Sequence, residues 1–287
     1  MTETIRSNLE DTVRHLSHNI GQRSFLDIKR LNEAALYIEE RLISINYKVE
    51  RQEFYFRGNP YFNIITKIKG INPDKRPIVI GAHYDTVVGT PGADDNASGV
   101  AALLELAKLG ISSRPERDII FVAFCLEEPP VFMTSRMGSF IFAKSLRQKG
   151  IKIEGMISLE MLGYFSDRKG SQLYPLSVFR LFYPDQGDFV AFVGNISSRS
   201  FTRRFLNIFR SISSFPVESL NAPSIIPGVD FSDHRSFWRF GYPAFMITDT
   251  AFYRNPNYHG PGDVSSTLDY QRMEELVIGL YRTIKVF

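Results

Sequence analysis

The sequence predicts an α/β fold, a three-layer sandwich in which a central mixed, mostly parallel sheet is flanked by helices on both faces. Apolar segments of strand length alternate along the chain with segments of helical spacing. Two strand segments, PIVIGAHYD (77–85) and RDIIFVAFC (117–125), are almost continuously apolar, as parallel strands covered on both faces tend to be. A chain of 287 residues, 44% of them hydrophobic, is long enough to bury such a sheet.

The elements follow in a regular order. Residues 3–20 and 27–46 carry apolar side chains at helical spacing, and two strands at 48–56 and 62–70 flank a Gly-Asn-Pro turn. Further strands are predicted at 77–85, 117–125, 153–161, 188–195 and 242–250, and further helices at 97–109, 136–149, 198–212 and 267–286. The absence of a repeat, a low-complexity tract or a linker predicts a single domain over 1–287, with the helices of 1–46 packed on it.

Composition excludes several classes of function. The formal charge of +3 arises from 34 basic and 31 acidic residues that are interspersed, so no nucleic-acid partner is expected. The polar N-terminal stretch and the lack of any apolar run of membrane length predict no membrane partner and a cytoplasmic location. The single cysteine, Cys125, rules out a disulfide within the chain and suits a reducing compartment.

Unusual polar residues occur where the predicted strands end. The segments are AHYD (82–85), LEEPP (126–130), SLEM (158–161), the loop NYHGPGD (257–263) and the loop PGADDNASG (91–99). Because ligands of open α/β sheets bind outside the carboxyl ends of the strands, these segments are expected to meet at one rim.

Each segment also has a simpler explanation: a hydrogen-bonded loop pair, a helix cap among Asp94, Asp95 and Asn96, a turn, or an ion pair with a core arginine. Taken together, these explanations need a separate partner for every acid, whereas a metal centre accounts for all of them. The predicted ligands are His83, Asp94, Glu128, Glu160 and His259, with Glu127 left as an acid/base. Imidazole and carboxylate without thiolate suit zinc, and cobalt or manganese would accept the same donors.

In the order HYDT, PGADDNASG, LEE, SLEM, SDHRSFW and YHGPGD, these motifs resemble those of zinc-dependent aminopeptidases with two co-catalytic metals. That family shares its fold with glutamate carboxypeptidases and glutaminyl cyclases, and the resemblance runs from about residue 60 to the C-terminus. It implies two zinc ions bridged by Asp94, peptide substrates, and an imidazole of His83 that is oriented by Asp85. It also implies that Glu127 is the general base toward a metal-activated water and then passes the proton to the leaving amine.

Two departures from the family pattern bear on function. Glu160 stands where many relatives have aspartate, which makes a single zinc ion the alternative to two. The glutamates are followed by PPVFMTSRMGS in place of a shorter Gly-rich stretch, which changes the entrance of the site. Aminopeptidase activity is the leading expectation. A glutaminyl-peptide cyclotransferase with one zinc is the alternative. A carboxypeptidase and a non-catalytic binding module of the same fold are less favoured.

Three further residues are expected at the substrate pocket. Tyr258 precedes a predicted ligand, so its hydroxyl is placed to hold an oxyanion. His234 and Phe237 lie in SDHRSFW and are assigned to the pocket lining, with a structural role as the competing explanation for His234. The long aromatic segment 163–188 is expected to form a lid or a pocket wall.

Overall fold

The computed structural model describes residues 2–287, and its eight strands form one sheet in the order β1-β2-β4-β3-β5-β8-β6-β7. The strands are β1 (Val49–Phe56), β2 (Asn59–Ile68), β3 (Ile78–His83), β4 (Ile119–Phe124), β5 (Gly155–Glu160), β6 (Val190–Gly194), β7 (Val217–Asn221) and β8 (Ala244–Thr248). The β4-β3-β5-β8 block and the β6–β7 pair are parallel. The pairs β1–β2, β2–β4 and β8–β6 are antiparallel. The predicted mixed, mostly parallel sheet is confirmed.

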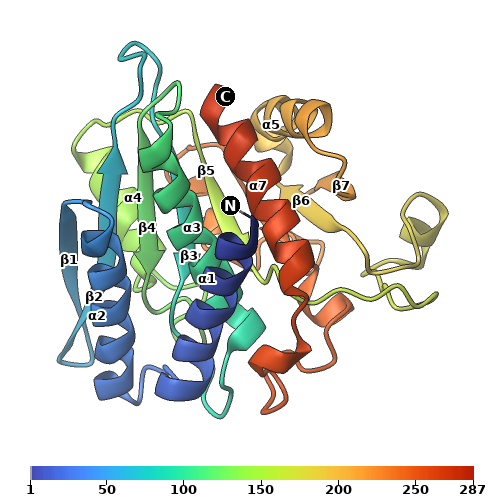
Figure 1. The fold of residues 1–287 in the computed structure, drawn as a ribbon, viewed down its shortest axis with the longest axis horizontal. Coiled ribbons are helices and arrows are strands. Elements are labelled where there is room, and N and C mark those ends of the chain that lie inside the picture. The colour runs from blue at the N-terminus through green and yellow to red at the C-terminus, as the bar shows by residue number, and fades with distance from the viewer. Residues whose placement is uncertain (1) are drawn as a thin grey trace.

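Helices cover both faces of this sheet (Figure 1). The helices are α1 (Thr2–Arg14), α2 (Ile28–Ser44), α3 (Gly99–Ser112), α4 (Gly138–Gln148), α5 (Arg199–Ile212), α6 (His234–Trp238) and α7 (Tyr270–Val286). α1, α2, α3, α5 and α7 share a hydrophobic core with one face, and α4 and α6 contribute to the core on the other. The three-layer arrangement predicted from the sequence is therefore confirmed.

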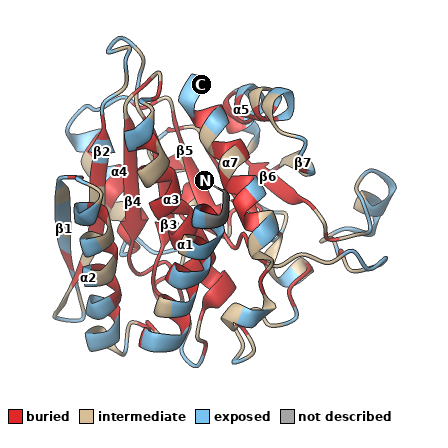
Figure 2. Cartoon of the chain, viewed as in Figure 1, coloured by how far each residue is buried: buried red, intermediate tan, exposed pale blue. Residues whose placement is uncertain are grey.

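The central strands explain why the sheet is covered twice. Every residue of β3, β4 and β5 is buried, and Figure 2 shows the central strands as a buried layer between half-exposed helices. Along β3 and β4, Ile80 and Phe121 enter the core beneath α3, whereas Val79 and Val122 enter the core beneath α4. Because successive strand residues point to opposite faces, a continuously apolar strand needs a layer on each side.

Two segments differ from the predicted pattern. The edge strand β7 was not predicted, because Val217–Asn221 is short, half-exposed and without an apolar alternation. Residues 163–188 form one short helix at Ser177–Leu181 and are otherwise irregular, reaching out beyond the β6–β7 side of the molecule (Figure 1). Among residues 2–287, no helix is both long and apolar enough to cross a membrane. The cytoplasmic location stays a prediction.

Candidate metal centre

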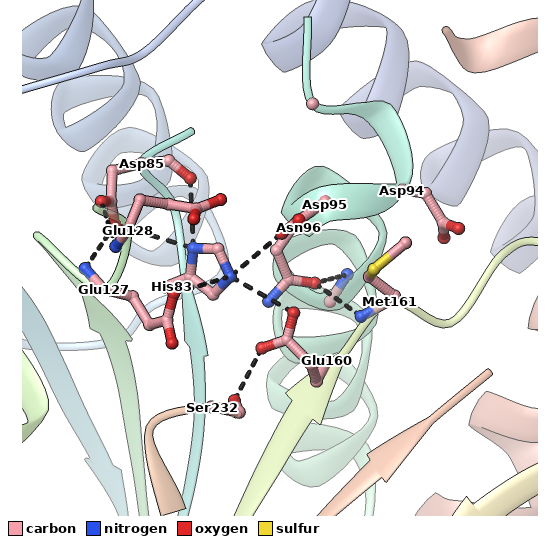
Figure 3. Close-up of polar contacts among 12 residues, drawn as sticks. His83, Asp85, Asp94, Asp95, Asn96, Glu127, Glu128, Glu160, Met161 and Ser232 are labelled. Carbon is pink, nitrogen blue, oxygen red and sulfur yellow. Dashed lines mark hydrogen bonds and ion pairs between the residues drawn. The ribbon is translucent and has the colours of Figure 1, made fainter. Parts of the chain in front are cut away.

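The carboxyl ends of neighbouring strands deliver the polar side chains to one point (Figure 3). His83 is the last residue of β3, and Glu160 is the last residue of the adjacent strand β5. Glu127 and Glu128 follow β4, and His259 lies in the loop after β8. All but His259 are more than nine-tenths buried. The structure thus brings these five predicted site residues together at the rim of the sheet.

The carboxylate of Asp95 lies between the two imidazoles. Its Oδ1 is 3.3 Å from Nε2 of His83, and its Oδ2 is 3.2 Å from Nε2 of His259. Glu160 Oε1 lies 3.4 Å from His83 Nε2, and Glu128 Oε2 lies 3.4 Å from His259 Nε2. Three groups of three possible ligands occur among the described residues. Two of them share Asp95, one with His83 and Glu160 and the other with Glu128 and His259, and the third combines His83, Glu127 and Glu128.

Asp94, the predicted bridging carboxylate, does not lie with these side chains, and Asp95 occupies the position expected of it. The Asp94 carboxylate accepts hydrogen bonds from the Gly163 backbone N–H at 2.9 Å and the Asn255 side chain at 2.8 Å. Figure 3 shows it turned away from the cluster. The backbone of Asp95 departs from helical geometry (φ −106°, ψ 90°), so the two neighbouring side chains project in different directions. The carboxylate of Asp263 accepts hydrogen bonds from the backbone N–H groups of Asp94 and Asp95, and these bonds hold the segment in place.

Asp85 holds the histidine and the two glutamates in place. Nδ1 of His83 lies 3.1 Å from the backbone carbonyl of Asp85 and 3.6 Å from its carboxylate. The carboxylate itself accepts hydrogen bonds from the backbone N–H groups of Glu127 and Glu128, at 3.0 and 3.1 Å. The predicted contact to the imidazole is thus made mainly by the carbonyl. The side chain of Asp85 ties the end of β3 to the turn after β4.

The donor atoms fit a metal ion. Asp95 Oδ1 and Glu128 Oε1 are buried without a hydrogen-bond partner within residues 2–287. Tetrahedral zinc ligands about 2.0–2.1 Å from the ion lie about 3.3 Å from one another. The distances of 3.2–3.4 Å between imidazole nitrogens and carboxylate oxygens match that spacing. Four buried carboxylates facing two imidazoles would be costly without added positive charge, and divalent cations supply it.

Electrostatics in the cluster follow from this crowding. Burial raises the pKa of Glu127 well above its usual range, His83 opposes the rise, and Glu128 adds to it. Burial likewise raises the pKa of Glu128 to about 8. Burial lowers the pKa of His259, but its hydrogen bonds to Asp95 and Glu128 outweigh this effect and raise it to about 10. Added positive charge would therefore favour the ionised form of Glu127 and Glu128.

A largely apolar, partly open cavity lies beside the cluster. Glu160 and Tyr258 are among its lining residues. The Tyr258 ring stacks on His259 with centroids 3.8 Å apart and an interplanar angle of 19°. Burial, reinforced by the nearby carboxylates, raises the pKa of Tyr258, so its hydroxyl keeps its proton at neutral pH. Tyr258 therefore lies beside the cluster, and its predicted role at an oxyanion stays a prediction.

His234 and Phe237 are outside the lining of this cavity, and their assignment to the pocket is corrected. His234 is fully buried, with Nε2 2.9 Å from the Val229 carbonyl, and its ring meets Trp238 edge-on. Phe237 packs against Phe124 and Phe142 in the core beneath α4. Because α6 contacts β5 and β8, its buried side chains pack in the core.

Three residues that sequence reasoning did not assign also organise the site. Ser232 donates a hydrogen bond to Glu160 Oε2 at 2.6 Å, and Asn96 bonds the backbone on both sides of Glu160. Ser232 lies in the motif SDH and Asn96 in the motif ADDN, so their place in these motifs could have indicated a role at the site. Arg23 carried no sequence signal. It is completely buried and donates hydrogen bonds to the backbone carbonyls of Leu16, Gly21, Tyr84, Pro91 and Gly92.

Comparison with known proteins agrees with this geometry. Residues 63–281 match the family described as Peptidase family M28. The uncharacterized protein YfbL of Escherichia coli K12 is 44% identical over 281 residues, covering 95% of this chain and 85% of the relative. A probable leucine aminopeptidase of Arthroderma otae is 28% identical over 242 residues, covering 79% of this chain and 56% of the relative. The chain thus spans about half the length of that aminopeptidase.

Solved structures share the fold. BSAP, a zinc aminopeptidase from Bacillus subtilis, superposes with a TM-score of 0.75 at 16% identity, with 98% of each chain covered. The glutaminyl cyclase of Porphyromonas gingivalis gives a TM-score of 0.72 at 18% identity, with 97% of each chain covered. The resemblance to an aminopeptidase fold that is shared with glutaminyl cyclases is confirmed.

The matched range of residues 63–281 includes every motif that contributes to the metal centre, from HYDT to YHGPGD. The extent of this match and the 44% identity to YfbL lead to the same assignment. This chain belongs to peptidase family M28.

Proposed function

We propose that this protein is a zinc-dependent aminopeptidase that releases N-terminal residues from peptides. The single observation that carries the proposal is the position of Asp95, shared by two groups of three metal-binding side chains. His83, Asp95 and Glu160 would hold one zinc ion, and Asp95, Glu128 and His259 the other. The additional methylene of Glu160 is accommodated, because its Oε1 reaches the same 3.4 Å distance from an imidazole as Glu128 Oε2 does.

Glu127 is the candidate general base because the two groups that share Asp95 are complete without it. Its Oε2 stays 4.0 Å from His83 Nε2, farther than any of the proposed ligands lies from its imidazole. Bound zinc would supply Lewis acidity toward the scissile carbonyl and the attacking water. Glu127 takes one proton from that water as the carbon–oxygen bond forms. It passes the proton to the departing nitrogen as the carbon–nitrogen bond breaks, and a carboxylic acid and a free amine result.

Tyr258 is placed to assist on the carbonyl side. Its ring packs on His259 beside the metal centre, and its hydroxyl is protonated. A phenol in this position can donate a hydrogen bond to the carbonyl oxygen as negative charge develops there.

The charge of the site favours recognition of an N-terminus. Within residues 2–287, the lining of the cavity contains carboxylates but no lysine or arginine. A free α-amino group is attracted by carboxylates, whereas the C-terminal carboxylate of a carboxypeptidase substrate needs a cationic partner. This distribution supports aminopeptidase over carboxypeptidase action.

One substrate panel tests the proposal. The purified protein would be assayed on aminoacyl-coumarins, on peptides with N-terminal glutamine and on peptides with C-terminal glutamate. Each assay would be run before chelation, after chelation and after zinc is restored. Zinc-dependent release of coumarin is the expected result. Pyroglutamate formation without coumarin release would instead assign a cyclotransferase, and release of C-terminal glutamate a carboxypeptidase.

A further inference from the structure

The cavity beside the metal centre runs along one row of the sheet. Glu160 on β5 pairs with Thr248 on β8, Thr248 with Ala191 on β6, and Ala191 with Glu218 on β7. Directly paired residues of neighbouring strands point to the same face of a sheet. All four residues line the cavity, so Glu160 and Glu218 mark its two ends. Three strand spacings separate them, or about 14 Å.

Between these ends the cavity is apolar. The next row of the same face, formed by Met246, Val193 and Leu220, extends its floor. Aromatic rings of the segment 163–188, which passes the β6–β7 side of the sheet (Figure 1), form a wall above β7. Tyr174 and Tyr183 stack with centroids 5.8 Å apart at an interplanar angle of 29°, and Phe179 meets Tyr183 edge-on at 5.8 Å.

Glu218 has no partner in this surrounding. Within residues 2–287, its half-buried carboxylate forms no hydrogen bond or ion pair, and burial raises its pKa, with Arg210 opposing the rise. Arg210 directs its guanidinium to the Val217 carbonyl at 3.1 Å. The nearby tyrosine hydroxyls are also engaged elsewhere, Tyr174 with the Pro184 carbonyl and Tyr183 with the Ser219 carbonyl. A half-buried acid without a partner favours an incoming cation.

We propose that Glu218 is a specificity-determining residue that selects peptides with an N-terminal lysine or arginine. This inference rests on the proposed aminopeptidase function, in which the substrate's α-amino group and scissile bond lie at the Glu160 end. A long straight side chain then extends over the apolar floor toward Glu218. The aromatic wall suits both its methylene stem and its charged end. A carboxylate at the end of an otherwise apolar pocket is a known device for selecting basic side chains.

Glu218→Gln tests the inference, with Glu50→Gln as the matched control. Glu50 is an exposed residue of β1, the edge strand on the opposite side of the sheet, so the control removes the same charge far from the cavity. The zinc-loaded enzymes would be compared on lysyl-, arginyl-, leucyl- and phenylalanyl-coumarin. In wild type we expect kcat/KM for lysyl and arginyl substrates to exceed that for leucyl by about tenfold or more. In Glu218→Gln this ratio should fall by about tenfold, and in Glu50→Gln it should not change. Glu218→Asp, which keeps the charge, should retain part of the preference.

A binding measurement separates this inference from the proposed function. Lysine amide and leucine amide would be titrated against zinc-loaded Glu127→Gln and against Glu127→Gln/Glu218→Gln, with the thermal shift as the readout. Lysine amide should stabilise the first protein more than leucine amide does, and the difference should disappear in the second. Equal responses in both proteins would overturn the role of Glu218. Failure of wild type to hydrolyse any aminoacyl-coumarin would overturn the aminopeptidase function. The role of Glu218 in binding a basic side chain would still be decided by the thermal shifts.

Discussion

Asp95 Oδ2 lies 3.2 Å from Nε2 of His259, and this contact joins a loop that follows β3 to a loop that follows β8. The second oxygen of the same carboxylate faces His83 at 3.3 Å. One side chain thus serves both halves of the cluster, whereas its neighbour Asp94 points elsewhere. The consequences for metal binding differ sharply between the two aspartates.

Replacing Asp95 by Asn should release zinc, because it removes the anionic donor that both groups share. We expect zinc affinity to fall by more than about 100-fold, beyond the usual effect of changing a residue outside the ligand set. Asp94→Asn is the control, since its carboxylate contacts Gly163 and Asn255. Zinc per chain, measured after dialysis against a graded chelator series, distinguishes the two. Equal losses of zinc in both variants would contradict a bridging role that belongs to Asp95 alone.

Glu127→Gln should abolish turnover and keep the metal. The amide cannot accept the proton of the attacking water, so kcat should fall by about 10²–10⁴-fold. Zinc content should match wild type, because both ligand groups are complete without Glu127. Metal analysis and steady-state kinetics on one preparation would check both expectations. Loss of zinc in this variant would instead identify Glu127 as a ligand.

Arg23→Met should destabilise the protein and loosen the metal loop. The substitution leaves several buried backbone carbonyls without a donor, which costs roughly 1–3 kcal/mol for each group left unsatisfied. Urea denaturation of the metal-free protein would measure the loss of unfolding free energy. Arg282→Met, at an exposed position of α7, is the control. If both variants unfold at the wild-type urea midpoint, the buried guanidinium contributes no stability.

His234 should make stability depend on pH. Burial lowers its pKa from 6.5 to about 4, although the hydrogen bond to Val229 opposes this effect. Between these two pH values the unfolded chain binds a proton that the folded chain does not. The stabilising effect of neutral His234 is therefore present above about pH 6.5 and is lost as pH falls toward 4, by on the order of 3 kcal/mol.

His234→Gln isolates this effect from the buried acids, which titrate in the same range. The variant can still donate to the Val229 carbonyl but cannot take up a proton. The unfolding free energies of wild type and variant would be measured by denaturant titration from pH 7 to 4. As the pH falls, wild type should lose more unfolding free energy than the variant does. A constant difference would mean that His234 titrates normally in the folded protein.

The sequence predicted the fold and the meeting of the strand ends, because both follow from general rules. Continuous apolar strands require two helical layers, and parallel strands carry the residues after them to one edge. His83 and Glu160 therefore came together from their positions at the ends of strands alone. The edge strand β7 was missed because nothing in Val217–Asn221 has the periodicity that marks a half-buried strand.

The choice between Asp94 and Asp95 could not be made from sequence. Both have the right chemistry, and only contacts with Asp263, Gly163 and Asn255, all distant along the chain, orient the loop. Phe237 illustrates the same limit, since an aromatic residue in a motif next to the site fits a core as well as a pocket. Tertiary packing decides such cases.

The zinc content of the purified protein tests the central claim most directly. Elemental analysis would be made on protein purified without added metal, after chelation and after zinc is restored, with hydrolysis of lysyl- and leucyl-coumarin followed in parallel. The account predicts two zinc ions per chain, loss of activity with chelation, and recovery of both when zinc returns. A protein that hydrolyses these substrates without bound metal, or that binds no zinc at all, would contradict it.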